Sequence, residues 1–291
     1  MSTRLASHGR LINRAKALSF TFNGKVMSGF EGDTLAASLL ANDQMLMGRS
    51  FKYHRPRGVL ASGGEEPNAL INLGVESGFE PNARATTTET FSGLTAASQN
   101  HFPSLEFDVG AINSKLSRFL PAGFYYKMFI HPRSFWKHIY EPIIRHSAGL
   151  GKAPKARDQD SYEHYYHHCE VMVVGGGIAG LQAARSAAAT GVRVLLVEQT
   201  ANWGGRAPVD GVLIEGMAAE RWIAQTLKEL AAADNVVIRN RTQGSGVYDH
   251  GYALAYERIA DHTPGDGRPR HRLWRVRCKQ IVTATGAIER P

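Results

Sequence analysis

The sequence is most informative at a glycine-rich turn that reads Gly175-Gly-Gly-Ile-Ala-Gly180. The turn follows the apolar run Val171–Val174 and leads into the alanine-rich run 178–190. A strand, a glycine turn and a helix in this order predict a βαβ unit, because parallel strands need a crossover helix. In such a turn Gly175 permits the tight bend, Gly177 lets a pyrophosphate approach the backbone, and Gly180 lets the helix lie close to the sheet. The helix N-terminus then offers N–H groups to the phosphates.

An acidic residue, Glu198, follows the second buried strand of this unit, which we predict over residues 192–197. A carboxylate there accepts hydrogen bonds from an adenosine ribose and repels a 2′-phosphate, which disfavours NADP. FAD and NAD share the ADP half that these residues bind, so the turn leaves open which of the two it holds. The alternative is a glycine turn without a ligand, but here the strand, the glycines, the helix and the terminal acid all occur in register. We therefore predict a Rossmann-type dinucleotide-binding site.

Two later motifs narrow the fold of this domain. Trp203-Gly-Gly-Arg206 supplies a glycine pair, Gly204 and Gly205, that can pass beneath the pyrophosphate, and Ala284-Thr-Gly286 ends an apolar strand. Between these motifs we predict a helix over 217–233 and a strand over 236–238. An antiparallel meander is predicted over 246–249, 253–259 and 273–278, with a hairpin tip at 263–269, and a last strand over 281–285. This order resembles the two-dinucleotide-binding flavoprotein superfamily, which has a glutathione-reductase-like fold.

Residues 1–100 predict a separate α/β domain. Two β-prone runs, 18–22 and 25–30, are joined by Asn23-Gly24, which is a strong hairpin signal because both turn positions need positive φ. Asp33 is placed to cap a helix over 34–41. The remaining predicted features are Asn42 at the helix C-terminus and strands over 69–73 and 85–90. A hairpin followed by a helix is the opening of a β-grasp, or ferredoxin-like, domain.

Residues 101–168 predict a helical connector and a linker. Aromatic residues cluster at helical spacing in 124–129 and 135–140, and they could either form a box that faces a cofactor or pack on their neighbours, which we favour. Three prolines, Pro121, Pro132 and Pro142, are expected to divide the stretch into short helices. Residues 149–160 have the composition of a surface linker. The dinucleotide-binding domain is then expected over 169–291.

The net charge of +8 would suit nucleic acid or an anionic membrane. The basic residues are scattered, however, and the densest run, Arg49-Ser-Phe-Lys-Tyr-His-Arg-Pro-Arg57, is interrupted by aromatic residues and a proline. Such runs are more often solvated faces or docking surfaces, so we expect no nucleic-acid partner. No apolar run approaches the roughly 18 residues of a membrane span, and we expect no membrane partner.

The chain has two cysteines, Cys169 and Cys278, and they do not form a C-x-x-C pair. This argues against a disulfide framework and fits a reducing compartment. The first 18 residues hold four basic residues and no acid, which also suits an organellar presequence, but they lack the apolar stretch of a secretory signal. We expect a cytoplasmic protein.

Other candidate chemistry is sparse. His164, His167 and His168 could present imidazoles to a metal on one helical face, but no carboxylate or cysteine of matching geometry accompanies them. A polar linker is the simpler interpretation, and we expect no metal site. The spacing shows no Ser/His/Asp or Cys/His arrangement. We therefore assign no catalytic residue to this chain.

Five stretches identify a closer family. They read Arg49-Ser-Phe-Lys-Tyr-His-Arg-Pro-Arg-Gly58, Glu65-Glu-Pro-Asn-Ala-Leu70, Tyr140-Glu-Pro-Ile-Ile-Arg145, Tyr248-Asp-His-Gly-Tyr252 and Ala284-Thr-Gly-Ala-Ile-Glu-Arg-Pro291. In this order, over nearly the whole chain, they resemble the N-terminal part of the alpha subunits of heterotetrameric sarcosine oxidases. That family oxidises sarcosine to glycine and forms hydrogen peroxide with formaldehyde or methylene-tetrahydrofolate.

The resemblance implies cofactors and partners. NAD would bind to this chain without being reduced, FAD would lie in the beta subunit, and FMN would lie between alpha and beta. The partners would be the beta, gamma and delta subunits. By residue match, the NAD contacts would be Ala179, Glu198, Gln199, Thr200 and Arg206, with a backbone contact near Gly244. The family often reads Asp-Glu-Arg where this chain reads Glu198-Gln199-Thr200.

The family's alpha subunits continue well past an Ala-Thr-Gly strand. We therefore expect this chain to match part of one, with a dinucleotide-binding domain that is incomplete at the C-terminus, no folate-binding region and no activity in isolation. We also expect no iron–sulfur cluster, because the loop 59–66, where cluster-bearing relatives of the β-grasp domain would place cysteines, holds no thiol. Two other functions stay open. One is a self-contained FAD-dependent oxidoreductase, and the other is a non-catalytic scaffold that docks flavin-bearing partners.

Overall fold

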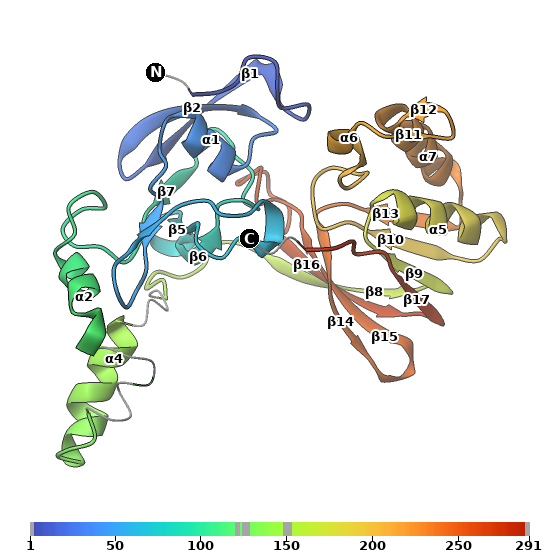
Figure 1. Cartoon of the computed structure of the whole chain (residues 1–291). Coiled ribbons are helices and arrows are strands. Elements are labelled where there is room, and N and C mark those ends of the chain that lie inside the picture. The colour runs from blue at the N-terminus through green and yellow to red at the C-terminus, as the bar shows by residue number, and fades with distance from the viewer. Residues whose placement is uncertain (1–2, 120–122, 124–128, 148–152, 289–291) are drawn as a thin grey trace. The chain divides into compact units, whose positions relative to one another are not determined.

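The computed structural model describes residues 3–119, 123, 129–147 and 153–288 of a mixed α/β chain (Figure 1). The chain divides into two compact units, Met1–Gln159 with Glu289–Pro291, and Asp160–Ile288.

The first unit is built on a five-stranded mixed sheet in the order β2-β1-β7-β5-β6. Its strands are β1 (Asn13–Phe22), β2 (Lys25–Glu31), β5 (Leu70–Leu73), β6 (Glu80–Arg84) and β7 (Thr95–Ala97). β1 and β2 form the predicted hairpin, and its turn residues Asn23 and Gly24 have φ values of 50° and 76°. Helix α1 (Leu35–Ala41) places Leu35 and Leu39 in one apolar core with Phe20 of β1.

The predicted cap of this helix was wrong by one residue. Thr34 is the N-cap of α1, and its hydroxyl accepts a hydrogen bond from the Ala37 N–H at 3.2 Å. The Asp33 carboxylate accepts instead from the Phe30 N–H at 2.9 Å and forms an ion pair with Arg4 at 2.6 Å. Asp33 therefore holds the bend between the hairpin and the helix. Asn42 is the C-cap, as predicted.

The strand predicted over 85–90 was also wrong, because residues 85–88 form turns and bends and Glu89 forms only an isolated bridge with Thr34. The carbonyls of Ala85 and Thr88 accept hydrogen bonds from Ala36 and Leu35 at the start of α1, at 3.0 Å and 2.8 Å. This segment caps the helix and cannot extend the sheet, and the strand β6 lies directly before it.

The rest of the first unit consists of short elements. They are β3 (Gly48–Arg49), β4 (Pro56–Arg57), the short helical turns η1 (Gly63–Glu65), η2 (Glu76–Gly78), η3 (Val109–Ala111), η4 (Ser117–Phe119) and η5 (Trp136–Tyr140), and the helices α2 (Ile112–Lys115) and α4 (Glu141–Ser147). Pro142 does not divide the chain as expected. The π-helical turn η5 ends at Tyr140, and α4 begins at Glu141 without a gap, so the chain stays helical through Pro142.

The aromatic residues of the connector contact one another. The Tyr140 ring lies 5.1 Å from the Phe129 ring and 6.1 Å from the Phe135 ring, measured between centroids. Phe135 and Trp136 remain 43% and 38% exposed, so these rings form a surface cluster rather than a core. Most of the predicted cluster 124–129 lies outside the described residues.

The second unit contains the predicted βαβ unit. A parallel sheet in the order β13-β10-β9-β17 is formed by β9 (Val171–Val174), β10 (Val194–Val197), β13 (Val236–Arg239) and β17 (Gln280–Thr283). Helix α5 (Ile178–Ala189) joins β9 to β10, and helix α7 (Ala219–Ala232) precedes β13. Alternate strand residues face opposite layers, because Val173 and Leu196 share a core with the two helices while Met172 and Leu195 pack toward a second sheet.

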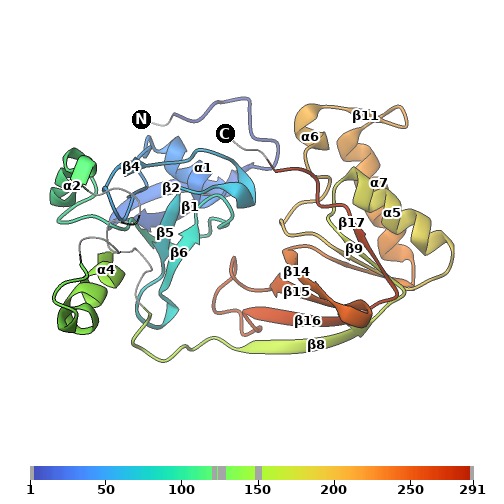
Figure 2. The same cartoon turned by 60° about the horizontal axis from the view of Figure 1, so that its bottom comes forward.

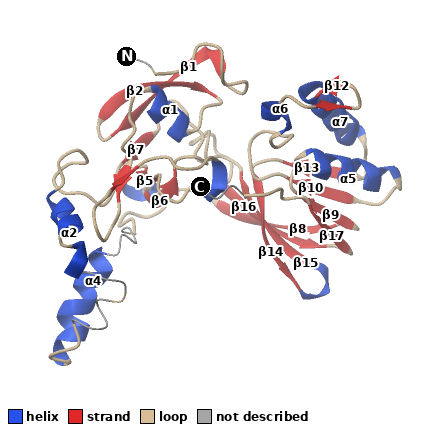
Figure 3. Cartoon of the chain, in the orientation of Figure 1, coloured by secondary structure: helices blue, strands red, loops and turns tan. Residues whose placement is uncertain are grey.

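The second sheet has the order β14-β15-β16-β8 (Figure 2). It consists of β14 (Thr242–Tyr248), β15 (Tyr252–Arg258), β16 (His271–Arg277) and β8 (Tyr162–His168). The first three are the predicted meander, with boundaries moved by a few residues. β8 was not predicted. It comes from the stretch interpreted as a linker and pairs parallel with β16 (Figure 3). His164, His167 and His168 therefore lie on a strand, and the helical face proposed for them was wrong.

The remaining elements of the second unit are short. They are α6 (Ala207–Asp210), β11 (Leu213–Ile214), β12 (Met217–Ala218) and η6 (Asp249–Gly251). Among the helices that the structure describes, none combines the length and the apolar character needed to cross a bilayer.

Candidate dinucleotide-binding site

The glycine turn between β9 and α5 bends tightly against the end of β17. Gly175 has a φ of 110°, and a Cβ atom there would lie 2.2 Å from the carbonyl oxygen of Ala284. A Cβ atom on Gly180 would lie 1.8 Å from the carbonyl oxygen of Gly175. Neither position can hold a side chain, so the first glycine permits the bend and the second brings α5 against β9.

Gly177 is glycine for a different reason. It is the N-cap of α5 with a φ of −70°, which any residue adopts, and a Cβ atom there would meet no described atom within 4 Å. The space beside it faces the first turn of α5, whose N–H groups have no carbonyl partner within the helix. Ala179, on the same turn, is exposed. The turn thus leaves room for a ligand at the positive end of the helix.

A second glycine loop packs on the first. The Gly204 N–H donates to the Gly176 carbonyl at 2.8 Å. Gly205 has a φ of 58°, and a Cβ atom there would lie 3.3 Å from the Gly177 Cα. The two loops therefore approach backbone to backbone, which places the glycine pair beside the helix N-terminus as the sequence suggested.

Glu198 lies beneath the turn and is only 8% exposed. One carboxylate oxygen accepts from the Gly176 N–H at 2.7 Å. The other accepts from the Thr200 N–H at 2.8 Å and from the Thr200 hydroxyl at 2.9 Å. The carboxylate therefore ties the end of β10 to the glycine turn, a role that the sequence analysis did not foresee. Each oxygen carries two lone pairs, so the group keeps acceptor capacity for a ligand hydroxyl.

The other predicted contacts lie farther out. Gln199 is exposed, and its carbonyl accepts from Arg258 at 2.9 Å. Arg206 is the N-cap of α6; its guanidinium lies 3.3 Å from the Asp210 carboxylate and its side chain is 68% exposed. The structure thus joins Glu198 and Thr200 by hydrogen bonds, while Thr200, Gln199 and Arg206 are all exposed.

Trp203 contributes to the site although the sequence analysis gave it no role. A Cβ atom on Gly176 would lie 2.4 Å from the Trp203 ring and 2.9 Å from the Glu198 Cβ. The indole ring therefore supports the glycine turn from below. Its position directly before the glycine pair was the signal available in the sequence.

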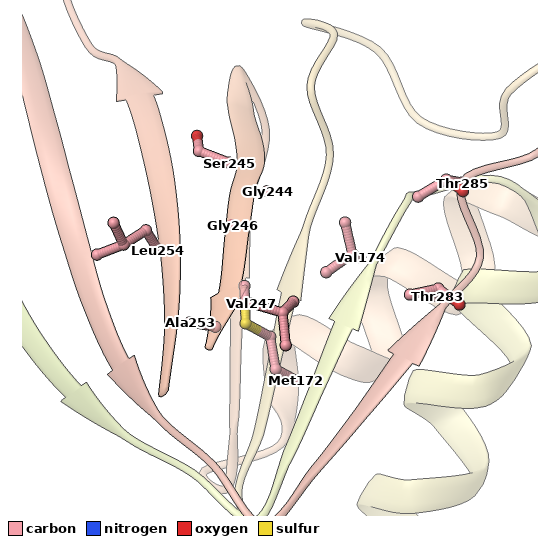
Figure 4. Close-up of a pocket in the computed structure, with 10 residues that line it drawn as sticks. All are labelled: Met172, Val174, Gly244, Ser245, Gly246, Val247, Ala253, Leu254, Thr283 and Thr285. Atoms are coloured by element: carbon pink, nitrogen blue, oxygen red, sulfur yellow. The ribbon is translucent and has the colours of Figure 1, made fainter. Parts of the chain in front are cut away.

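An apolar pocket of about 250 Å³ opens between the two sheets (Figure 4). Val174 and Thr285 line it at the carboxyl ends of β9 and β17, and Gly244 lines it from β14. A Cβ atom on Gly244 would lie 2.7 Å from a Val174 methyl group. Gly244, expected near the ligand from the family resemblance, thus lies beside the strand that carries the glycine turn.

The cysteines of this unit are not poised as nucleophiles. Burial raises the pKa of the Cys169 thiol to about 12 and also raises the pKa of Cys278, and a reactive cysteine needs a lowered pKa. Within the described residues, no cluster of three or more His, Cys, Asp and Glu side chains suits a metal ion.

In the first unit, backbone N–H groups surround a buried carboxylate, that of Glu66. Glu66 is fully buried, and its carboxylate accepts from the backbone N–H groups of Leu60 and Ala61 at 2.6 Å, of Asn68 at 2.6 Å and of Ala69 at 3.1 Å. Burial raises the pKa of Glu66, but the four backbone donors together lower it more, so its pKa lies below the ordinary value.

Two known families match the two units. Residues 15–101 match the family described as 2Fe-2S iron-sulfur cluster binding domain, and residues 170–257 match the family described as FAD dependent oxidoreductase. The first match does not extend to the cluster, because residues 15–101 contain no cysteine and cluster irons need thiolate ligands. Four N–H groups of the loop 60–69 converge instead on the Glu66 carboxylate.

Relatives match the chain over its full length. It is 49% identical to the sarcosine oxidase subunit alpha of Rhizobium meliloti (strain 1021), over 100% of this chain and 30% of that protein. It is 35% identical to the sarcosine oxidase subunit alpha of Corynebacterium sp. (strain U-96), over 97% of this chain and 25% of that protein. The chain thus spans less than a third of the length of these relatives.

A solved structure shows the same fold. The L-proline dehydrogenase from P. horikoshii matches with a TM-score of 0.57 and 19% identity, over 97% of this chain and 44% of that one. The sequence relatives and the two family matches agree with the resemblance read from the motifs. In sequence the chain is therefore similar to the N-terminal portion of the sarcosine oxidase alpha subunits.

Proposed function

We propose that residues 160–288 bind NAD through its ADP half, as the dinucleotide-binding part of a multi-subunit sarcosine oxidase. The observation that carries this proposal is the open N-terminus of α5, where Gly177 leaves space beside a second glycine loop. Pyrophosphate oxygens would accept hydrogen bonds from the N–H groups of the first helical turn, and the helix dipole would favour their charge.

Glu198 is the residue that would recognise the adenosine ribose. Its carboxylate closes the turn at the end of β10 and keeps lone pairs for a ribose hydroxyl. The same negative charge would repel a 2′-phosphate, which favours NAD over NADP. The choice of NAD over FAD rests on the family resemblance.

NAD supplies a hydride acceptor when a substrate lies against its nicotinamide ring. The family resemblance implies that NAD is bound here without being reduced, so we assign binding, not turnover, to this site. Sarcosine oxidation would require the beta, gamma and delta subunits, with FAD in beta and FMN between alpha and beta.

A second candidate function is favoured by one observation. The match of residues 170–257 to FAD dependent oxidoreductases is compatible with FAD in the same turn, since both dinucleotides carry ADP. Bound FAD would colour the purified protein, so its visible absorbance spectrum separates the two candidates.

The test is a calorimetric titration of NAD into the wild type and three variants. Gly177→Val should abolish binding, because the side chain would fill the space that the pyrophosphate needs. Glu198→Ala should weaken binding roughly ten- to hundredfold, since a hydrogen bond to a charged group contributes about 1.5–3 kcal/mol. Gly78→Val is the matched control, because Gly78 lies in the first unit with open space around it and no positive φ.

The variants also separate ligand contact from folding. Glu198→Ala removes hydrogen bonds within the protein as well, so the circular dichroism melting curve is recorded beside each titration. Wild-type affinity in Gly177→Val would exclude the helix N-terminus as the phosphate site. Wild-type affinity in Glu198→Ala would remove the ribose assignment alone.

A further inference from the structure

The outer face of the β14-β15-β16-β8 sheet carries an ordered set of aromatic and basic side chains. Side chains alternate along a strand, and the inward residues, among them Ala253, Trp274 and Val276, are buried in the core of the second unit. The outward positions of the same strands are mainly tyrosine, histidine and arginine. We name this surface the Tyr–Arg face and define it by the residues of the three rows described next.

Two of the rows cross the sheet from β8. In the first, the His271 ring lies 5.6 Å from the Tyr162 ring and 4.9 Å from the Tyr256 ring, between centroids. In the second, the Arg275 guanidinium lies 5.5 Å from the centre of the Tyr166 ring and donates to the Tyr166 hydroxyl at 2.9 Å. Each row therefore links neighbouring strands through side-chain contacts.

The third row lies at the other end of the sheet. The Arg277 guanidinium is 4.8 Å from the centre of the Tyr252 ring, and the Tyr252 ring is 5.8 Å from the Tyr248 ring. Tyr166 and Tyr248 are 66% and 54% exposed. The side chains are thus held in place by one another while a large part of their surface faces solvent.

The face is positively charged because the acids of the sheet lie elsewhere. The four strands contain two acidic residues, Glu163 and Glu257, and both bind Arg272 on the inner face, at 2.5 Å and 3.2 Å. One carboxylate, Asp261, lies 2.7 Å from the His271 ring at the edge of the face. The two arginines of the second and third rows have no such neutralising partner among the outward positions of the four strands.

We propose that the Tyr–Arg face docks a protein surface rich in aspartate and glutamate. Tyrosine and arginine are the residues that concentrate binding energy at protein interfaces. The guanidiniums of Arg275 and Arg277 lie against the tyrosine rings, and each can bind a carboxylate through its remaining N–H donors. β8 is an edge strand of the sheet, so a partner can also approach its open side.

A single-stranded nucleic acid fits this face less well. Bases bind protein sheets by stacking on free aromatic rings. Here guanidiniums already lie against the Tyr166 and Tyr252 rings, and the His271 ring lies between two tyrosines. The charge on the face is open to carboxylates, whereas the guanidiniums leave less of the Tyr166 and Tyr252 rings free for stacking.

The test measures binding of the full chain to fluorescently labelled poly-L-glutamate by anisotropy. In Arg275→Glu/Arg277→Glu, affinity should fall by at least about tenfold, because two carboxylate contacts become repulsive. The matched control is Arg221→Glu/Lys228→Glu, which makes the same change of charge at exposed positions of α7. It should retain most of the affinity.

Further outcomes decide the proposal. The milder Arg275→Gln/Arg277→Gln variant should lose part of the affinity. It preserves the test if the reversed variant fails to fold, as judged from the circular dichroism melting curve. Equal losses in both reversed pairs would show that only net charge matters and would overturn the proposal. Tighter binding of oligo-dT than of poly-L-glutamate, lost in the Arg275/Arg277 variants, would assign the face to nucleic acid instead.

Discussion

Replacing the buried Glu66 carboxylate should strongly destabilise the first unit. Each carboxylate oxygen accepts from two backbone N–H groups. In Glu66→Gln one acceptor oxygen remains and the other is replaced by an amide N–H₂ group. The two backbone N–H groups that donated to the replaced oxygen then have no acceptor. An unsatisfied buried donor costs about 1–3 kcal/mol, so the two together should cost about 2–6 kcal/mol. Glu65→Gln, the same change one residue earlier at a partly exposed position, should shift stability by less than about 0.5 kcal/mol.

Two assays measure this effect. Urea denaturation followed by far-UV circular dichroism gives the free energy of unfolding. Tryptophan fluorescence mainly follows the second unit, since three of the four tryptophans lie there and Trp222 and Trp274 are buried, and its main transition should not move. Hydrogen exchange should show that the amides of Leu60, Ala61, Asn68 and Ala69 lose protection in Glu66→Gln before other amides of the first unit.

The pH dependence has a definite sign. The pKa of Glu66 is lower in the folded chain than its ordinary value, so the folded state favours the charged form. Its contribution to stability is present above the unfolded pKa and is lost as the pH falls through the folded pKa. Wild type should therefore lose more stability than Glu66→Gln on acidification from neutral pH. Equal stability of the two proteins at pH 7, or equal protection of the loop amides, would refute this account of the loop.

Three further predictions concern both units. Gly180→Ala should destabilise the second unit by about 1–3 kcal/mol in urea denaturation, because its Cβ would lie 1.8 Å from the Gly175 carbonyl oxygen; wild-type stability would show that α5 can move. Protein purified without oxygen should contain no stoichiometric iron or sulfide, because residues 15–101 hold no cysteine. Iron and sulfide found in stoichiometric amounts by colorimetric assay would contradict this. The isolated chain should form no hydrogen peroxide from sarcosine, and turnover above the no-enzyme control would argue against the subunit interpretation.

The sequence predicted the elements whose local signals were strong. Asn23-Gly24 strongly favours a positive-φ turn, and the hairpin formed there. The apolar run Val171–Val174 and the glycines behind it produced the strand and turn in register. In these cases the residues that determine the structure are neighbours in the chain.

The errors arose where distant contacts decide the structure. β8 is rich in tyrosine and histidine and lacks apolar alternation, and it becomes a strand because β16 pairs with it more than a hundred residues later. Residues 85–90 have the composition of a strand but their carbonyls cap α1. The role of Glu198 as a clamp on the glycine turn depends on a contact across 22 residues. Such partners become visible only in the folded chain.

The central claim is that the glycine turn of the second unit holds NAD. The direct measurement is to equilibrate the purified chain with equimolar NAD, NADP and FAD, remove free ligand by gel filtration, denature the protein and identify the released dinucleotide by mass spectrometry. We predict that NAD is released, that NADP is nearly absent because of the Glu198 carboxylate, and that Gly177→Val releases none. Release of FAD in place of NAD, or equal release from Gly177→Val, would contradict the claim.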